Sequence, residues 1–444
     1  MLAVLNNPAY RRLFTAQVVA LAGTGLATVA LGLLAHDLAG PDAGAVLGTA
    51  LAIKMVAYVG IAPLAGALAA RLPRKTLLVG LDLVRAAIAL ALPWVDQVWQ
   101  IYLLIFLLQA ASAVFTPAFQ ATIPDIVTDE RDYTRALSLS RLAYDLESLL
   151  SPLLAAGALA VIGYDSLFFG TSLGFAASGL LVLAAVLPAT TDARVADRTF
   201  DATTRGIRVY LATPRLRGLL AVHLAVAAAG SMVLVNTVGY VRDVLGRDET
   251  AVALALAAYG LGSLVAALAL PGLLDRVADR TVMLRAATLP AVVLFVAIPA
   301  TALPGDWRWP ALLVLWAAIG VGGSLVLTPG GRLLRRSAHR EDLPAVFAAD
   351  FSLSHACWLL CYPLAGWLAT AASTTVALAV LGVLTTAATA VAVRCWPAHD
   401  PEEVEHLHEL DEDHDHLHDA VFVNGRWRHV HTYRIDRLHT RWPA

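Results

Sequence analysis

The side chains that could act together as ligands for a cation lie in two segments of this chain. In the first, around residue 350, Asp350, Ser354, Cys357 and Cys361 fall within roughly 60° of one another at helical spacing. His355 projects about 140° away from Asp350 and so lies off this stripe. Thiol, imidazole and carboxylate ligands suit Zn²⁺, Ni²⁺ or Co²⁺, so the stripe predicts a transient cation site. The alternative is that both cysteines pack as small apolar side chains.

The second place is an acidic, histidine-rich tract near the C-terminus. Residues 397–419 hold six histidines and ten acidic residues, without Lys or Arg. Short histidine-rich tracts are typical of metal binding, and imidazole with carboxylate suits Zn²⁺, Ni²⁺ or Cu²⁺. We expect weak binding of a divalent transition metal and disorder without it, because such a tract cannot bury a core. A solvated acidic tail is the alternative. The candidate ligands in the tail are His406, His408, His414, His416, His418, His429 and His431.

After this tract the pattern changes. Residues 421–435 alternate between apolar and polar side chains around Asn424-Gly425. An Asn-Gly pair between alternating runs predicts a β-hairpin with a type I′ turn.

Ionisable side chains inside apolar segments are costly and are therefore functional candidates. Lys54, one of only two lysines, either faces an internal cavity or reaches the membrane surface. Arg141 and Asp145 are spaced to pair with each other, which leaves Glu147 as a candidate proton carrier. Asp82 and Arg85 lie three residues apart, and this spacing predicts an ion pair on one helix face. A structural role for that pair is the favoured interpretation.

The composition restricts the class of protein. Of 444 residues, 58% are apolar and 15% are charged, whereas soluble proteins have about 25% charged residues. This composition excludes an ordinary soluble enzyme and a disordered chain. The net charge of -2 gives no sign of the basic surface that nucleic-acid binding requires. Three cysteines are too few for a disulfide scaffold. The chain shows no motif of a catalytic triad, phosphate loop or zinc protease, so we expect no enzyme and no required cofactor.

The apolar residues form long runs, and a helix needs about 20 such residues to cross a bilayer. We therefore predict an all-α polytopic membrane protein with twelve transmembrane helices. The expected spans are 11–36, 44–70, 76–95, 98–120, 134–163, 165–188, 214–241, 250–274, 281–303, 309–334, 342–371 and 374–396.

The distribution of arginine and lysine predicts the orientation. Most of them lie before the first span, after the even-numbered spans and in the middle connection. Basic residues favour the cytoplasmic side, so both termini should be cytoplasmic in a multi-pass protein of the cytoplasmic (inner) membrane. The expected partners are the lipid bilayer, protons and a small-molecule or metal-ion substrate, and we expect a monomer.

The chain also contains an internal duplication. Asn7-Pro8 with Arg11 precedes the first span, and Thr213-Pro214 with Arg217 precedes the seventh. The predicted divisions are a six-helix bundle (1–188), a cytoplasmic linker (189–213), a second six-helix bundle (214–396) and the tail (397–444). Internal repeats are common in secondary transporters, which bind substrate near the midplane between the repeats.

Two loops carry a family resemblance. Residues 66–75, Gly-Ala-Leu-Ala-Ala-Arg-Leu-Pro-Arg-Lys, and 272–280, Gly-Leu-Leu-Asp-Arg-Val-Ala-Asp-Arg, resemble the Gly-x-x-x-Asp-Arg-x-Gly-Arg-Arg loop of the major facilitator superfamily. In that family the loop latches the outward-facing state. Ala70 replaces the family's Asp in the first copy, whereas the second copy keeps Asp275, so the second half should carry the latch. The resemblance implies gating roles for Arg71, Arg74, Lys75, Asp82, Arg85, Asp275, Arg276 and Arg280.

Further resemblances concern the function. Residues 115–125 look like the fourth-helix exit of the drug-proton antiporter branch of this superfamily. The histidine-rich tail, with Asp350 and His355 in the eleventh span, resembles exporters of the nickel-resistance type. We therefore expect a proton-coupled exporter that works by alternating access, with Asp350 or Glu147 exchanging protons. Two substrate classes are open: a transition-metal cation such as nickel, cobalt or zinc, and small amphipathic organic molecules, as in multidrug efflux. A further alternative is a non-transporting, metal-sensing membrane receptor.

Overall fold

A computed structural model describes most of the chain. The described residues are 2–69, 73–120, 122–127, 129–187, 199–302, 304, 307–339, 342–398, 403–408, 421–423, 426–435 and 442.

The N-terminal half consists of six long helices and one short one. They are α1 (Pro8–Ala39), α2 (Ala43–Ala69), α3 (Arg74–Ala91), α4 (Val98–Gln120), α5 (Ile123–Ile126), α6 (Glu130–Leu159) and α7 (Asp165–Ala184). The C-terminal half has six further long helices with a short helix between two of them. They are α9 (Pro214–Gly239), α10 (Glu249–Leu274), α11 (Asp279–Ala300), α12 (Arg308–Leu327), α13 (Gly330–Ser337), α14 (Leu343–Ala371) and α15 (Thr374–Cys395).

These helices follow the apolar runs and end at local signals. Asn7 caps α1 by accepting hydrogen bonds from the amides of Ala9 and Tyr10, and Ser373 caps α15 in the same way. Gly40, with φ of 51°, ends α1 in a backbone conformation that other residues rarely adopt. Ten stretches of the described residues are long and apolar enough to cross a membrane, one of which contains both α1 and most of α2. These stretches include eleven of the twelve long helices, and α6 is the one that they do not include. The twelve predicted spans match the twelve long helices of the described chain in number and order.

The two halves repeat the same tie between their third and sixth long helices. At the start of α3, Lys75 donates a hydrogen bond of 3.0 Å to the carbonyl of Ala185, just after α7. At the start of α11, Arg280 donates hydrogen bonds of 3.0 and 2.9 Å to the carbonyl of Trp396, just after α15. A cation at a helix C-terminus satisfies carbonyls that have no partner within the helix. The duplication seen in the sequence therefore extends to specific contacts.

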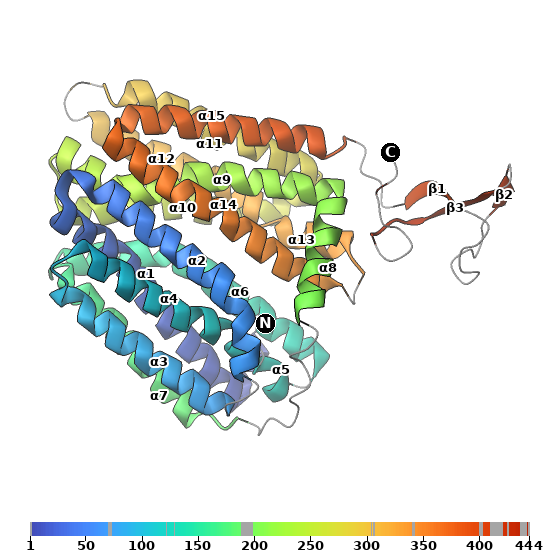
Figure 1. The fold of residues 1–444 in the computed structure, drawn as a ribbon, viewed down its shortest axis with the longest axis horizontal. Coiled ribbons are helices and arrows are strands. Elements are labelled where there is room, and N and C mark those ends of the chain that lie inside the picture. The colour runs from blue at the N-terminus through green and yellow to red at the C-terminus, as the bar shows by residue number, and fades with distance from the viewer. Residues whose placement is uncertain are drawn as a thin grey trace.

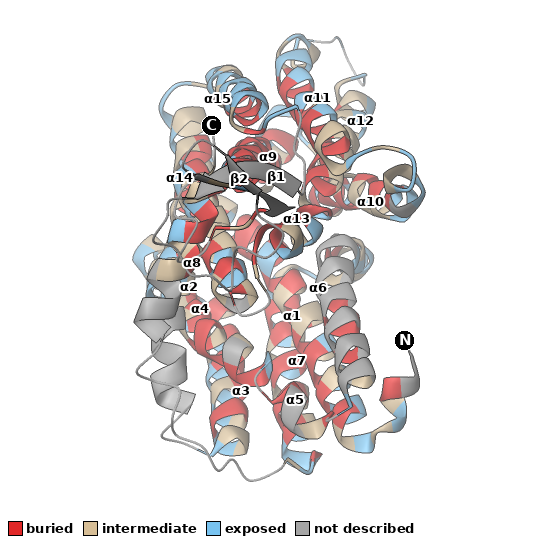
Figure 2. Ribbon diagram, turned by 90° about the vertical axis from the view of Figure 1, so that its right-hand side faces the viewer, coloured by how far each residue is buried: buried red, intermediate tan, exposed pale blue. Residues whose placement is uncertain are grey.

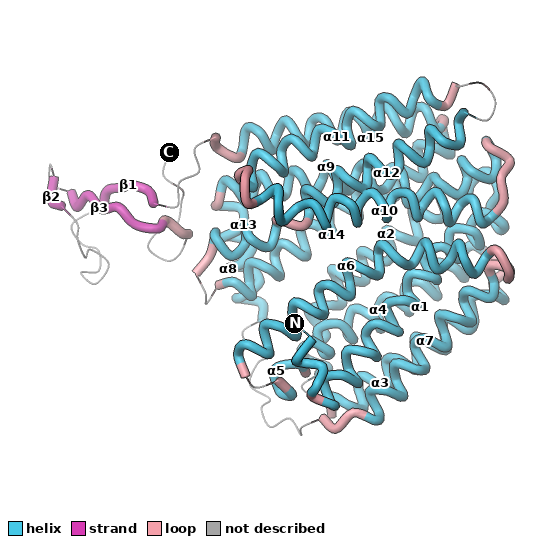
Figure 3. The backbone as a smooth tube through the Cα atoms, turned by 180° about the vertical axis from the view of Figure 1, so that it is seen from behind, coloured by secondary structure: helices cyan, strands magenta, loops and turns pink. Residues whose placement is uncertain are grey.

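The halves meet at one end of the bundle, which we call the loop end because it carries the α1–α2 and α14–α15 connections. There α2 and α14 approach so closely that a Cβ on Gly366 would lie 2.0 Å from the carbonyl oxygen of Gly44. His36, at the end of α1, bonds Asp243 beyond the end of α9 at 2.7 Å. Toward the opposite end, the tail end, the ribbons of the two halves diverge (Figures 1 and 3).

The linker between the halves is only partly as predicted, because it contains a helix, α8 (Thr199–Ala212). Arg205 of α8 forms an ion pair of 2.9 Å with Asp342, the residue before α14. Gly206 lies against α14 so closely that a Cβ would come within 2.1 Å of the carbonyl oxygen of Ala345. Helix α8 is thus held against α14, at the tail end of the C-terminal half.

The tail forms three strands, β1 (Glu403–His408), β2 (Val421–Val423) and β3 (Arg426–Thr432), in the order β1-β3-β2. The antiparallel pairing of β2 with β3 agrees with the predicted hairpin. Strand β1 corrects the expectation of disorder for residues 403–408, because pairing with β3 satisfies its backbone groups. The strands lie beyond the tail end (Figure 1). The chain then returns, and Tyr433 and Ile435 are buried against α8 and α9.

Candidate functional site

One group of titratable side chains lies in the C-terminal half, around Asp350 on α14. The hydroxyl of Tyr210 on α8 donates a hydrogen bond of 2.8 Å to Oδ1 of Asp350. Nε2 of His223 on α9 lies 3.2 Å from the same oxygen, although it does not have hydrogen-bond geometry. Three helices therefore place a carboxylate, an imidazole and a phenol together, and we call these residues the Asp350 cluster.

The packing of the helices explains why these groups meet. Helix α9 is buried along most of its length, as Figure 2 shows, so His223 is taken into the core with it. The buried Tyr210 belongs to the same apolar cluster as the start of α9. Burial, followed by the charge of Asp350, raises the pKa of Tyr210 well above its ordinary value. Its hydroxyl therefore stays protonated and remains a donor to the carboxylate.

His355 lies one turn further along α14, at the boundary between the halves. Its Nδ1 is 2.6 Å from the carbonyl oxygen of Phe351, which can only accept, so Nδ1 carries a proton. Its ring lies against Phe351 at 3.9 Å and near Tyr58 of α2 at 5.8 Å between centroids. His355 also interacts electrostatically with Lys54 in the other half and with Asp350.

The N-terminal half contains a cavity of about 30 Å³ between α1, α2, α4 and α7. Lys54 lines it together with Gln109, the hydroxyls of Thr24, Thr28 and Ser112, and apolar side chains. Within the described part of the chain, Lys54 makes no hydrogen bond or ion pair. The positively charged side chain of Lys54 therefore lies inside the apolar bundle, at the edge of a cavity.

Glu147 of α6 carries a compensating charge, since it and Lys54 interact electrostatically. The carboxylate lies beside α1 at Gly25, where a Cβ would come within 3.0 Å of Oε1 of Glu147 and 1.8 Å of Oγ of Ser151. The missing side chain of Gly25 therefore lets α6 bring Glu147 next to the helix that lines the cavity. Arg141 and Asp145 have side chains outside the described set, so their predicted pairing is untested.

The residues of the predicted cation site on α14 lie in different surroundings. Cys357 and Cys361 are buried in the main apolar core. The hydroxyl of Ser354 donates to the carbonyl of Phe351 at 3.0 Å, a bond within its own helix. Among the described residues, no three His, Cys, Asp or Glu side chains are grouped as metal ligands. Only Asp350 of the stripe belongs to the cluster with His223.

Asp82 and Arg85 form the ion pair that their spacing predicts, in the buried space between α3, α4 and α7. Ser178 donates a further hydrogen bond of 2.8 Å to Asp82. The guanidinium of Arg85 lies over the rings of Phe115 and Phe175 at 3.9 and 4.5 Å. This arrangement joins three helices and places no charge in the cavity, as expected of a structural pair.

In the second copy of the loop motif, Arg280 is the predicted residue that contacts a neighbouring helix end. Asp275 and Arg276 are exposed and, within the described residues, form no ion pair. Asp279 lies 3.6 Å from Arg332 instead, and Arg280 caps α15. In the first copy, Lys75 caps α7, Arg74 is half-buried, and Arg71 is outside the described residues.

Most of the tail ligands cannot be placed as side chains. His414, His416 and His418 lie outside the described residues. For the others the backbone register is known: His406 is opposite His429, and Val404 is opposite His431. Strand alternation places His408 two positions from His406, on the same face.

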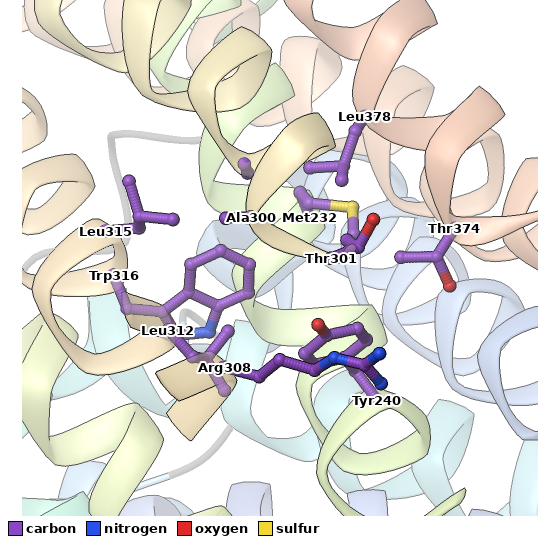
Figure 4. A pocket seen from close by; sticks show the side chains of 11 residues that line it. Met232, Tyr240, Ala300, Thr301, Arg308, Leu312, Leu315, Trp316, Thr374 and Leu378 are labelled. Atoms are coloured by element: carbon purple, nitrogen blue, oxygen red, sulfur yellow. The ribbon is translucent and has the colours of Figure 1, made fainter. Parts of the chain in front are cut away.

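A second cavity, of about 20 Å³, lies in the C-terminal half near the loop end (Figure 4). Trp316, Met232 and Leu312 form its apolar wall, and Arg308 lies close to Tyr240 at its rim. The indole of Trp316 donates to Thr237 at 2.7 Å, which fixes the wall. The cavity is remote from the Asp350 cluster and is almost wholly apolar around its single cation.

The sequence alone did not single out His223 or Tyr210. His223 is an ionisable residue within the apolar run of α9, so the rule that selected Lys54 could have found it. Tyr210 lies in the linker, and only the folding of α8 onto α14 brings it to Asp350.

The sequence model of the Major Facilitator Superfamily matches residues 13–244 and 219–435. This chain belongs to the Major Facilitator Superfamily. Membership of this superfamily implies transport across a membrane as the activity of the chain.

Individual relatives are more distant. The chain is 25% identical to the uncharacterized MFS-type transporter YfiS of Bacillus subtilis (strain 168) over 122 residues, 28% of this chain. It spans only 29% of the length of this curated relative. A bacterial homolog of the human lysosomal transporter Spinster, in an inward-facing and occupied conformation, superposes with a TM-score of 0.67 at 12% identity, covering 87% of this chain and 96% of that one. A D-xylose-proton symporter gives 0.64 at 13% identity, over 88% of this chain and 98% of that one. At such identities the likeness shows the fold alone.

Proposed function

We propose that this superfamily member is a proton-coupled exporter of small amphipathic organic molecules that works by alternating access. The observation that carries the coupling is the Asp350 cluster, a carboxylate held between a hydroxyl donor and an imidazole inside the bundle. Charged groups in such positions are costly and are typical of proton relays in transporters.

The cluster supplies the chemistry of a reversible proton site. With Asp350 ionised, the cluster carries a negative charge, and Tyr210 stabilises the carboxylate by its hydrogen bond. With Asp350 protonated, the cluster is neutral, and the free energy of burying the carboxyl group in the apolar bundle is lower. Tyr210 lies on α8 and Asp350 on α14. A change in the packing of these two helices would therefore also change how well the ionised carboxylate of Asp350 is stabilised.

The described residues favour an organic substrate over a metal ion. No group of three suitable ligands is assembled among them, and the two thiols of α14 lie in the core. The cavity of the N-terminal half has apolar walls with a few polar groups, which is typical of sites for small organic molecules.

We further propose that the tail end faces the cytoplasm, in agreement with the basic residues there. The close contacts at the loop end then make this an inward-facing conformation, closed toward the outside. A substrate arriving from the cytoplasm would reach the Asp350 cluster and the cavity, consistent with export.

A gradient experiment tests the coupling. In vesicles with the tail end outward and an acidic lumen, the wild type should accumulate members of a panel of amphipathic dyes, such as rhodamine 123 and fluorescein. Asp350→Asn should abolish the response to the pH gradient while dye-for-dye counterflow persists, because the variant cannot exchange a proton. Asp42→Asn, an exposed carboxylate at the loop end, is the matched control.

Gradient-driven accumulation by Asp350→Asn would contradict the proposal. Absence of dye flux in the wild type under every gradient would instead favour the metal-sensing receptor. Growth of a deletion strain separates the substrate classes, since we expect sensitivity to drugs rather than to Ni²⁺, Co²⁺ or Zn²⁺.

We also propose that the tail binds a divalent transition metal weakly. The support is the register, which pairs His406 with His429 across two strands and so brings distant histidines together. In calorimetric titrations with Ni²⁺ and Zn²⁺, the full chain should show a binding step that His406→Ala with His429→Ala weakens. An unchanged titration would refute the paired site.

A further inference from the structure

We propose that the N-terminal cavity binds the anionic group of the substrate, so that this transporter handles small organic acids with Lys54 as the counter-cation. The inference rests on the proposed function and narrows its substrate class. The observation behind this inference is the position of Lys54 at the edge of the N-terminal cavity, and no contact in the Asp350 cluster is used.

Two side chains that line the cavity have hydrogen-bond donors without a partner among the described residues. Lys54 has no hydrogen-bond or ion-pair partner within the described residues, and the buried amide of Gln109 likewise makes no hydrogen bond there. The hydroxyls of Thr24, Thr28 and Ser112 already donate to carbonyls of their own helices. An ammonium and an amide are therefore the free donors, and a carboxylate is the group that accepts from both.

The remaining surface selects a small amphipathic molecule. A cavity of about 30 Å³ has room for about two water molecules, which is similar to the volume of a carboxylate group. Leu51, Ile105 and Phe175 supply the apolar wall beside it. A short alkyl or aryl carboxylate matches this combination of one charge and an apolar body.

Glu147 competes for the same cation. It interacts electrostatically with Lys54, yet the two groups form no direct ion pair within the described residues. An incoming carboxylate would take the place of Glu147 as the partner of Lys54 and would be repelled by it. Removal of the two charges should therefore have opposite effects on binding.

Equilibrium binding to the purified full chain tests this without a proton gradient. The probes are benzoate and hexanoate, each compared with its neutral amide, and the readout is tryptophan fluorescence or thermal shift. In the wild type we expect each acid to bind at least about tenfold more tightly than its amide, equivalent to about 1.4 kcal/mol. Lys54→Gln should abolish this preference, Lys54→Arg should retain it, and Glu147→Gln should increase acid affinity.

Equal binding of acid and amide to the wild type would overturn the proposal, as would an acid preference that survives in Lys54→Gln. Failure of either acid to bind at about 10 mM would also overturn it, because a charged site should give measurable affinity there. If Lys54→Gln does not fold, the Glu147→Gln result decides. Asp42→Asn, at the exposed loop end, should keep the acid preference. The binding assay has no proton gradient, so a failure of proton coupling and a failure of this site are distinguishable.

Discussion

At the scale of the residue, the surroundings decide what each charge can do. Asp82 is fully enclosed, with Arg85 and Ser178 as partners, so it stabilises the fold. Asp350 accepts one hydrogen bond, from Tyr210, and the imidazole of His223 lies 3.2 Å away without hydrogen-bond geometry. Both are Asp residues in apolar helices, and only their neighbours distinguish a structural pair from a proton site.

The hydroxyl of Tyr210 should support proton coupling at Asp350. Tyr210→Phe removes a hydrogen-bond donor to the charged form of Asp350, so the ionised carboxylate loses stabilisation in the variant. A hydrogen bond to a charged group contributes about 1.5–3 kcal/mol, so gradient-driven dye accumulation should fall in Tyr210→Phe while dye-for-dye counterflow persists. Tyr58→Phe, the same chemical change on α2, is the control. Unchanged gradient-driven accumulation in Tyr210→Phe would show that the bond does not stabilise the working carboxylate.

At the scale of the element, glycines determine which helices approach closely. Gly366 and Gly48 let α14 and α2 meet across the two halves at the loop end. Gly25 lets α6 place Glu147 beside α1, and Gly206 lets the linker helix α8 lie on α14. The linker is therefore not a passive tether, because it carries Tyr210 into the Asp350 cluster.

The α2–α14 contact gives a prediction about conformation. In Gly366→Ala the new Cβ would lie 2.0 Å from the carbonyl oxygen of Gly44, so the closed loop end should be disfavoured. Spin-label distances between the halves at the loop end should shift toward longer values. Gly60→Ala, on α2 with nothing within 4 Å, should leave them unchanged. Identical distances in the two variants would mean that the contact does not hold the loop end closed.

At the scale of the whole molecule, two similar halves form unlike sites. Each half ties its third long helix to its sixth through a basic residue, Lys75 or Arg280. The N-terminal half contains the Lys54 cavity, whereas the C-terminal half contains the Asp350 cluster. Alternating access requires the halves to separate and meet in turn, so contacts between them set the balance of states.

The bond between His36 and Asp243 joins the halves at the loop end and should bias that balance. Exposed pairs contribute about 0.2–1 kcal/mol, so His36→Ala should raise the population with an open loop end by a factor of about 1.5–5. Single-molecule fluorescence between loop-end labels measures that population. His339→Ala, at the tail end, is the control. A lower open population in His36→Ala would be the opposite of this prediction.

The fold was largely predictable, and the site was only partly so. Long apolar runs must form helices in a bilayer, which is why twelve spans and the division near residues 189–213 follow from the sequence. The hairpin followed from Asn424-Gly425. Helix α8 and strand β1 did not, because their polar sequences show weak signals and fold against other elements. The ion pair of Asp82 and Arg85 was predictable because both residues lie on one helix face.

The sequence by itself determined that this is a duplicated helical membrane protein with few charges inside, because the bilayer imposes length and hydropathy on every span. It also supplied Asp350, Lys54 and Glu147 as candidates. Only the tertiary structure decided their partners, His223 and Tyr210 for Asp350 and an open cavity for Lys54. The physical reason is that these partners come from separate helices, whose meeting depends on packing that no local pattern records.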